Sequence, residues 1–392
     1  MTPTTACFAW WTARPAGNGG TTSAQPSGPT TWRSWSSDWI WQQRVWSWPA
    51  STCTGCGPAR PSTRCPMVDP IAMPNVAGSD SPVVTVAPGW AFAAVTVLGA
   101  LVVVAAMLDG ALSARSSGGP GGAPGGAARP FGEAARLMRQ RRRTTVQADS
   151  LLWRIGGAGL LVTAALMVAV VPLGRWTIFD LDVGVMWFNA MDVMVWALVW
   201  LTGWGANSAH SLVGGYRFLA HGLGYELPLM FALVAPAIAA ESLNVGRVAA
   251  AQDGLWFVVW MPVAFLVYLL GVAAFSVWGP FAPALGSDVA GGVRAELSGV
   301  DRLVFETGRY ALLAAGAAFA VPMFLGGGAG PLLPDWAWVL VKTVTVLSLL
   351  VWLRRRLPAF RPDTFMEVGW LVLLPAVLVQ DLLVAVVAVW RS

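Results

Sequence analysis

Long apolar runs, separated by shorter polar stretches, recur along the chain from residue 84 onward. An α-helix rises about 1.5 Å per residue, so a helix of roughly 20 apolar residues crosses the ~30 Å hydrocarbon core of a bilayer. The pattern therefore predicts eight membrane-spanning helices, at residues 84–108, 151–172, 183–203, 223–241, 255–278, 303–325, 336–353 and 368–390.

The composition agrees with a membrane protein. Charged residues make up 11% of the 392 residues, where a soluble domain has ~25%, and apolar residues make up 56%. So few charges cannot cover the surface of a soluble protein of this length, so most of the surface must face lipid. We therefore predict an all-α polytopic integral membrane protein, and exclude a soluble enzyme, a disulfide-stabilised secreted protein and a disordered regulator.

The arginines indicate how the predicted helices are oriented. Of the 25 basic residues only Lys342 is a lysine, and the arginines gather at the ends of the apolar runs, which argues against a nucleic-acid-binding surface. The odd-numbered connections carry fifteen arginines and the even-numbered connections carry two. The excess of arginine in cytoplasmic loops places the odd connections in the cytoplasm and both termini outside.

Residues 1–66 differ from the rest of the chain. They hold eight of the 23 tryptophans and all four cysteines, but no Leu, Glu or Lys. Too few aliphatic residues are present to form a core, so we expect a disordered segment or an over-extended start upstream of an initiator such as Met67 or Met73. The pair Cys53 and Cys56 has a redox or half-zinc spacing, which is a weak signal without a second pair.

Two of the acids within predicted spans are candidates for proton relay, because ionisable groups at bilayer depth are costly and usually functional. Glu226 has two interpretations, a relay group or a carboxylate at a helix start that the helix dipole favours. Asp192 is either a relay group or a polar contact between helices, with Asn189 one turn back as its hydrogen-bond partner.

Other charged residues in the spans have simpler interpretations. Asp109 ends the first run at the cytoplasmic interface, where solvation by water is the simpler interpretation. Asp381 is another acid within a span. Lys342 either extends to the interface or is a buried cation. Glu306 and Arg309 are one helical turn apart and are expected to pair.

The chain contains none of the common catalytic motifs. It has no phosphate-binding loop of the Gly-x-x-x-x-Gly-Lys-Ser/Thr type, and no Ser–His–Asp set can be nominated. His210 and His221 flank an amphipathic loop predicted at residues 208–221, and their wide spacing makes a metal site improbable. We therefore predict no metal site.

Four stretches occur in an order that resembles one known family. They are DLDVGV at residues 180–185, GWGANS at 203–208, YELPL at 225–229 and a basic segment with a following apolar run at 353–375. Their order and spacing are similar to those of the H subunit of NADH-quinone oxidoreductase, the respiratory complex I. The resemblance covers roughly residues 84–390, which we expect to form an eight-helix membrane domain of that type.

The resemblance implies roles for individual residues. Glu226 matches the family's acid after tyrosine, and Asp288 and Glu296 match acids of the connection after the fifth span. Asp109 stands in place of a glutamate, and with Asp192 it completes the predicted relay candidates. The quinone-entry region is expected at four residues of the first connection: Pro130, Phe131, Gly132 and Arg136.

The chain also departs from the family pattern. Phe275 stands where the family has a glutamate, Trp278 where it has an arginine and Ala282 where it has an aspartate. In the family these charged residues lead from the quinone chamber toward the membrane arm.

The resemblance implies a multi-pass protein of the bacterial plasma membrane that helps couple quinone reduction to proton transport. Quinone is then the substrate, while NADH, FMN and iron–sulfur clusters are carried by partner subunits of the membrane and hydrophilic arms. The main alternative is the related membrane subunit of a membrane-bound hydrogenase or formate-hydrogenlyase complex. A stand-alone transporter is a third hypothesis, for which an internal inverted repeat is expected and none is visible.

Overall fold

Eight long apolar helices run through the residues that the computed structural model describes, which are 83–117, 122–286 and 291–391. Each, counted together with the short helical turns that adjoin it, is long and apolar enough to cross a membrane, which confirms the number of spans expected from the sequence. The principal helices are α1 (Ala91–Ser117), α3 (Ser150–Val168), α4 (Gly184–Gly205), α5 (Ala209–Ala239), α8 (Pro262–Phe275), α9 (Gly299–Phe324), α10 (Asp335–Leu353) and α12 (Leu374–Arg391). The prediction for residues 1–66, and Asp288, lie outside the described residues.

Shorter elements join these helices. They are β1 (Val84–Thr85), β2 (Trp176–Thr177), α2 (Gly122–Arg139), α6 (Val245–Ala250), α7 (Phe257–Trp260), α11 (Pro362–Val368), the 3₁₀ turns η1 (Pro88–Trp90) and η2 (Gly279–Leu285), and the π-helical turn η3 (Gly369–Leu373). β1 pairs in parallel with β2, with Val84 opposite Trp176. The first span was expected to begin at residue 84, but this pairing holds the chain extended there and helix begins only after it.

Helix α5 corrects the sequence-based prediction for residues 208–221. These residues were expected to form a loop before a span starting at 223, but α5 is a single helix of 31 residues that starts at Ala209. Two of its polar residues are buried and find distant partners: the Ser211 hydroxyl donates to the Val293 carbonyl at 3.3 Å, and His221 Nε2 lies 3.3 Å from the Phe360 carbonyl oxygen. Because those partners come from other segments, hydropathy along the chain could not reveal this part of the helix.

Helix α9 lies at the centre of the helix packing. It contacts α3, α10, α1 and α8. In its most apolar stretch 78% of the residues are buried, compared with 17% in the first span and 22% in the last. Close approach to α3 depends on Gly308, where an added Cβ would lie 2.7 Å from the Cβ of Leu160. The first and last spans therefore present most of their surface to lipid or to other chains.

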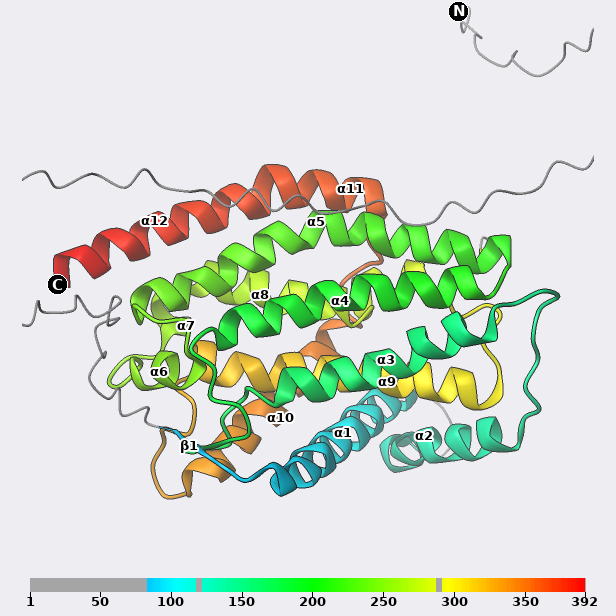
Figure 1. Cartoon of the computed structure of the whole chain (residues 1–392), viewed down its shortest axis with the longest axis horizontal. Coiled ribbons are helices and arrows are strands. Elements are labelled where there is room, and N and C mark those ends of the chain that lie inside the picture. Colours follow the sequence, from blue (N-terminus) through cyan, green and yellow to red (C-terminus); the bar gives the residue numbers. More distant parts are fainter. Residues whose placement is uncertain (1–82, 118–121, 287–290, 392) are drawn as a thin grey trace, which may run out of the picture. The chain divides into compact units, whose positions relative to one another are not determined.

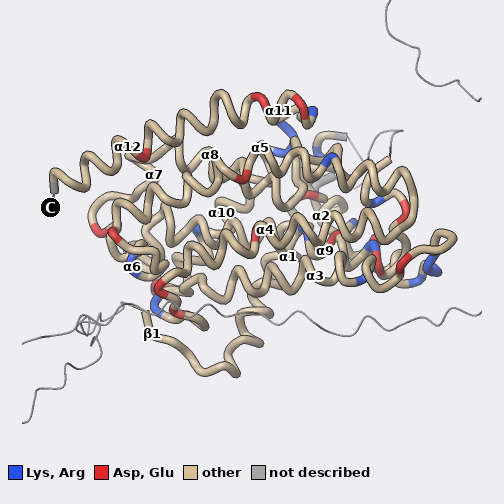
Figure 2. The backbone as a smooth tube through the Cα atoms, turned by 45° about the horizontal axis from the view of Figure 1, so that its top comes forward, with Lys and Arg blue, Asp and Glu red and all other residues tan. Residues whose placement is uncertain are grey.

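The order of the layers follows from these contacts. Helix α12 packs on α5 and α8, α5 packs on α4, α4 on α3, and α3 on α9. Figure 1 shows α12 and α1 on opposite sides, with α4 and α5 between them. Figure 2 shows that charged residues gather toward the ends of the helices, with few along their middle parts. The few charged residues in the middle of the helices are therefore the candidates for a functional site.

Candidate functional site

A pair of acids on neighbouring helices forms the centre of the candidate site. Asp192 on α4 has no exposed surface, and Glu226 on α5 is half-buried beside it. The two carboxyl groups interact electrostatically with each other. Within the described residues, no carboxyl oxygen of either side chain has a partner at hydrogen-bond geometry. The α4–α5 packing thus brings together two acids that are 34 positions apart in the chain.

The interpretation of Glu226 as a helix-start carboxylate is wrong. Glu226 lies well inside α5, because that helix begins at Ala209 and not near residue 223. The stabilisation of a carboxylate by the helix dipole is confined to the first turn. A polar contact between Asp192 and Asn189 is not formed either, because the side-chain oxygens of both residues lack a hydrogen-bond partner among the described atoms.

Aromatic side chains surround the acid pair. The Trp196 indole donates to the Tyr225 hydroxyl at 2.9 Å, and the two rings meet edge to face with centroids 6.2 Å apart. The Tyr268 hydroxyl donates to the Gly316 carbonyl at 2.7 Å. Asp192 interacts with both tyrosines. This environment excludes bulk water while leaving hydroxyl groups close to the acids.

The backbone around Glu226 is held by the C-terminal span. Pro228 has no N–H, so it cannot donate to the carbonyl of Gly224 as a regular α-helix requires. Gly369 of η3 approaches this carbonyl so closely that a Cβ there would lie 2.2 Å from the oxygen. The Trp370 indole donates to the Leu223 carbonyl at 3.1 Å. A π-helical turn is thus packed against the turn of α5 that carries Glu226.

Asp109 belongs to a second, separate charge cluster. It accepts hydrogen bonds from Arg354 at 2.8 Å, from Arg355 at 3.1 Å and from the Tyr310 hydroxyl at 3.2 Å. The carboxylate is therefore paired and not simply solvated, which corrects the simpler interpretation of this residue. These contacts fasten the second half of α1 to the middle of α9 and to the end of α10.

The expected pair of Glu306 and Arg309 is confirmed, at 2.6 Å, and Glu306 also pairs with Arg294 at 3.1 Å. The Arg309 guanidinium lies 5.7 Å from the centre of the Trp278 ring, and the Arg354 guanidinium lies 4.6 Å from the same centre. Trp278, which stands where the family has an arginine, thus connects the Glu306 group to the Asp109 group through two cation–π contacts.

The remaining predicted residues lie elsewhere in the structure. Glu296 is half-buried and accepts a hydrogen bond from the Ser208 hydroxyl at 2.8 Å, at the start of α5. The four residues predicted for quinone entry all lie on α2, where Phe131 and Arg136 are exposed. Arg136 pairs with Glu133 at 2.6 Å, and this hydrogen bond lowers the pKa of the Glu133 carboxyl.

Lys342 is buried, and its ammonium group reaches back to the connection between α9 and α10, so the structure combines the two interpretations of this residue. Its ammonium group donates to the carbonyls of Leu325, Gly327 and Ala329 at 2.7, 2.9 and 2.8 Å, and lies 4.4 Å from the Trp256 ring centre. All three donors of the ammonium are thereby used. Lys342 fastens the connection between α9 and α10 and is not available as a relay group.

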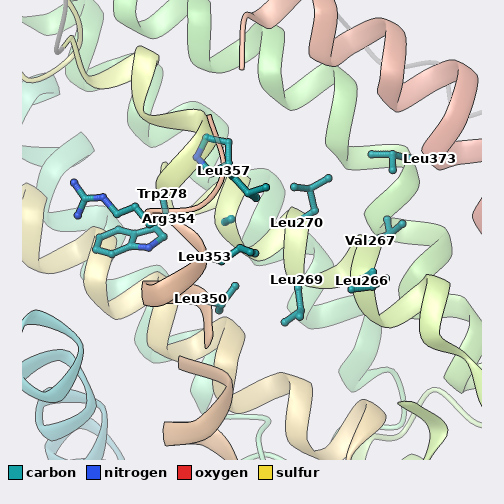
Figure 3. Close-up of a pocket in the computed structure, with 12 residues that line it drawn as sticks. Leu266, Val267, Leu269, Leu270, Trp278, Leu350, Leu353, Arg354, Leu357 and Leu373 are labelled. Carbon is teal, nitrogen blue, oxygen red and sulfur yellow. The ribbon is translucent and has the colours of Figure 1, made fainter. Parts of the chain in front are cut away.

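A cavity of about 180 Å³ lies between α8, the end of α10 and the turn η3, beside the Asp109 cluster. Figure 3 shows Trp278 next to Arg354 at one end, with leucine side chains such as Leu269 and Leu350 around the space. Its volume is below the ~300–1,000 Å³ that is typical of ligand sites. This cavity alone does not hold a molecule as large as a quinone.

The residue types also limit which groups this part of the chain can hold. Among residues 83–117, 122–286 and 291–391, no three His, Cys, Asp or Glu side chains gather closely enough to bind a metal ion. His221 is buried and packs edge to face on Phe281, with ring centroids 5.3 Å apart. The aromatic residues around both clusters, Tyr225, Trp196 and Tyr310, were not predicted from the sequence. Tyr225 alone had a signal, because it precedes Glu226 within the YELPL stretch.

Comparison with known proteins identifies relatives along most of the described chain. A family model described as NADH dehydrogenase matches residues 87–385. The chain is 34% identical over 271 residues to the second NADH-quinone oxidoreductase H subunit of Geobacter sulfurreducens, an alignment that covers 66% of this chain and 82% of the relative. It is 31% identical over 278 residues to the second NADH-quinone oxidoreductase H subunit of Syntrophobacter fumaroxidans, covering 68% and 84%.

A relative from Geobacillus kaustophilus, also an H subunit of NADH-quinone oxidoreductase, is 32% identical over 249 residues, covering 62% of this chain and 75% of the relative. All three relatives carry the name of the same subunit, and nothing in these similarities favours the hydrogenase alternative.

Proposed function

We propose that this chain, which belongs to the NADH dehydrogenase family, is the membrane subunit of a NADH-quinone oxidoreductase complex and couples quinone reduction to proton transport. Its place is the plasma membrane of a bacterium, where it assembles with the other membrane and hydrophilic-arm subunits. NADH, FMN and the iron–sulfur clusters belong to those partners, and quinone is the substrate of the assembled complex.

The observation that carries the coupling role is the pair of Asp192 and Glu226. Two ionised carboxylates placed together in a low-dielectric interior repel each other, so the pair is most stable with a proton shared between the two groups. A proton that arrives at one carboxyl group is therefore passed on by the other. No partner at hydrogen-bond geometry within the described residues competes for these oxygens.

The chemistry of the step is a proton transfer between oxygen atoms. One carboxyl group donates its proton to the neighbouring carboxylate, and the hydroxyl groups of Tyr225 and Tyr268 lie near enough to Asp192 to interact with it. The packed aromatic rings keep bulk water from short-circuiting the transfer. In this proposal Glu296, in the connection between α8 and α9, lies on the path toward the pair.

Asp109 has a different role in this proposal. Its carboxylate is paired with two guanidinium groups and a tyrosine hydroxyl, and these contacts join α1 to α10. We therefore assign it to the mechanical connection between the quinone side and the spans, and not to the proton path.

The quinone site in this proposal is shared with partner subunits. The 180 Å³ cavity beside Arg354 is too small for the whole ring and tail. Helix α2 carries Pro130, Phe131, Gly132 and Arg136 next to α1, and its exposed side chains are free to line an entry together with a neighbouring subunit. The chain then contributes one wall of the site and the proton path that leads away from it.

The test compares conservative variants of the pair within the assembled complex. Glu226→Gln and Asp192→Asn keep size and shape but remove titration, so each should abolish most proton pumping in inverted membrane vesicles. Glu226→Asp should retain part of the pumping, because the acid remains with a shorter reach. Glu241→Gln is the matched control, since Glu241 is an exposed acid just beyond the end of α5.

Quinone reductase activity and subunit composition are measured on the same vesicles, so that a failure to assemble is separated from a failure to pump. Pumping at the wild-type ratio of protons to electrons by both Glu226→Gln and Asp192→Asn would exclude the pair from the proton path.

A further inference from the structure

A larger apolar cavity lies at the opposite end of the spans from the Asp109 cluster. Its volume is about 500 Å³, within the range of small-molecule sites, and its walls come from the first halves of α1 and α10, the end of α3 and the strand β2. These segments all adjoin the end of the helices that carries the even-numbered connections. The cavity is therefore separate from the acid pair and from the quinone side of the proposed function.

The cavity is elongated along the helices. It is lined by α1 and its preceding turn from Trp90 to Leu101 and by α10 from Trp336 to Thr343. At 1.5 Å per residue these stretches correspond to about 16 Å and about 10 Å along the helix axes. Its inner wall includes Ala318 of the buried helix α9. A long and narrow space of this kind fits a hydrocarbon chain better than a compact ring system.

The interior offers no charge and no free hydroxyl hydrogen. Apart from three tryptophans at its mouth, the lining residues are apolar except for Thr177 and Thr343. The Thr177 hydroxyl donates to the Phe179 carbonyl at 3.3 Å, and the Thr343 hydroxyl donates to the Val339 carbonyl at 2.7 Å. A polar head group would find no donor inside, so only the apolar part of an amphiphile belongs there.

The mouth of the cavity has a different character. Trp90, Trp176 and Trp336 are exposed there, and tryptophan side chains favour the level of the lipid head groups. Arg175 directly precedes Trp176, is exposed, and is one of two arginines in the even-numbered connections. Its backbone is held in place because the Val84 N–H donates to the Arg175 carbonyl at 2.6 Å.

We propose that this slot binds one acyl chain of an anionic phospholipid, whose phosphate group pairs with the Arg175 guanidinium. The length of the slot favours an acyl chain, and its interior excludes the head group. The exposed Arg175 beside the tryptophans favours a negatively charged head group. The lipid fills the space between α1 and α10, two spans that otherwise contact each other over only part of their length.

The test uses the purified, delipidated complex and a phosphatidylglycerol that carries a diazirine on one acyl chain. After illumination, labelled peptides should map to residues 86–101 and 336–343. Ala94→Phe fills the slot and should remove this labelling, whereas Val95→Phe on the exposed side of the same helix should leave it unchanged.

The head-group part of the proposal has its own variants. Phosphatidylglycerol should compete for the labelled site about fivefold better than phosphatidylcholine, the size expected of one basic residue at a membrane surface. Arg175→Gln should remove this preference while labelling persists. Arg247→Gln, which changes the other arginine of the even-numbered connections, should leave the preference unchanged.

Labelling that Ala94→Phe leaves intact would overturn the proposal, as would equal competition by the two lipids in the wild-type protein. Displacement of the label by a long-chain quinone in preference to phosphatidylglycerol would also overturn it, because the slot would then belong to the substrate. Lipid labelling does not depend on proton pumping, so it fails or succeeds separately from the proposed function.

Discussion

Replacing Asp192 with leucine should stabilise the fold while it removes coupling. Asp192 has no exposed surface, and neither of its oxygens has a partner at hydrogen-bond geometry within the described residues. Leucine has the same branching at Cγ, with two methyl groups where aspartate has two oxygens. The substitution therefore removes two buried polar atoms without opening a cavity.

The expected size follows from the cost of burying a polar group. An unsatisfied buried polar group costs about 1–3 kcal/mol, and replacing buried charged groups by apolar side chains of similar volume stabilises some proteins by ~1–4 kcal/mol. Asp192 also interacts with Glu226, and removing that neighbour relieves a second acid of a like-charged group. We therefore expect Asp192→Leu to raise the free energy of unfolding by about 1–3 kcal/mol.

Unfolding by SDS titration in mixed micelles measures this change, followed by the loss of helical circular dichroism. Met194→Leu is the matched control, because Met194 lies on the same helix and is 48% exposed, so its effect should stay within about 0.5 kcal/mol. In vesicles, Asp192→Leu should lose proton pumping. Stability and activity should thus move in opposite directions, as they do where a functional group is kept at a cost in stability.

A double-mutant cycle with Glu226→Gln extends the test. Because the two carboxyl groups are neighbours, their effects on unfolding should deviate from additivity by at least about 0.5 kcal/mol. The reasoning is refuted if Asp192→Leu lowers the free energy of unfolding by about 1 kcal/mol or more while the control is unchanged. That result would mean that the carboxyl group makes a hydrogen bond on which the fold depends.

Three further predictions concern topology and the charged residues outside the acid pair. Reporter proteins fused after Arg143 and after Arg361 should read cytoplasmic, and one fused within residues 326–330 should read external; a reversed reporter would contradict the arrangement of eight spans. Lys342→Met should lower the free energy of unfolding by roughly 3 kcal/mol, because three backbone carbonyls lose a charged donor; a change below ~0.5 kcal/mol in SDS titration would contradict this. Asp109→Asn should cost about 1 kcal/mol, because its ion pairs with arginine are partly exposed, and should leave proton pumping largely intact in vesicles; loss of pumping at normal stability would return this residue to the relay.

The amino-acid sequence alone determined the class of the protein and the number of its spans. In lipid every backbone polar group must be bonded within the segment, so a run of some 20 apolar residues has one available structure, and that structure depends on local sequence only. The pairing of Glu306 with Arg309 was predictable for the same reason, since one helical turn places both on one face. The resemblance to the NADH-quinone oxidoreductase family also rested on short local motifs.

The length of α5 and the environment of each acid depended on the tertiary structure. Residues 208–221 look polar along the chain, but His221 is buried against Phe360, which is 139 positions away. Asp192 and Glu226 were each nominated from the sequence, yet only the packing of α4 on α5 makes them a pair.

Asp109 shows most clearly that the partners of a charged residue cannot be predicted from the sequence. The sequence predicted an acid at the end of α1, and the structure supplied its partners Arg354 and Arg355, about 245 positions later in the chain. Hydropathy is a sum over neighbouring residues and is therefore readable from the chain itself. The partner of a buried charge is set by which helices pack together, because only that packing decides whether the charge lies beside an opposite charge, a like charge or lipid.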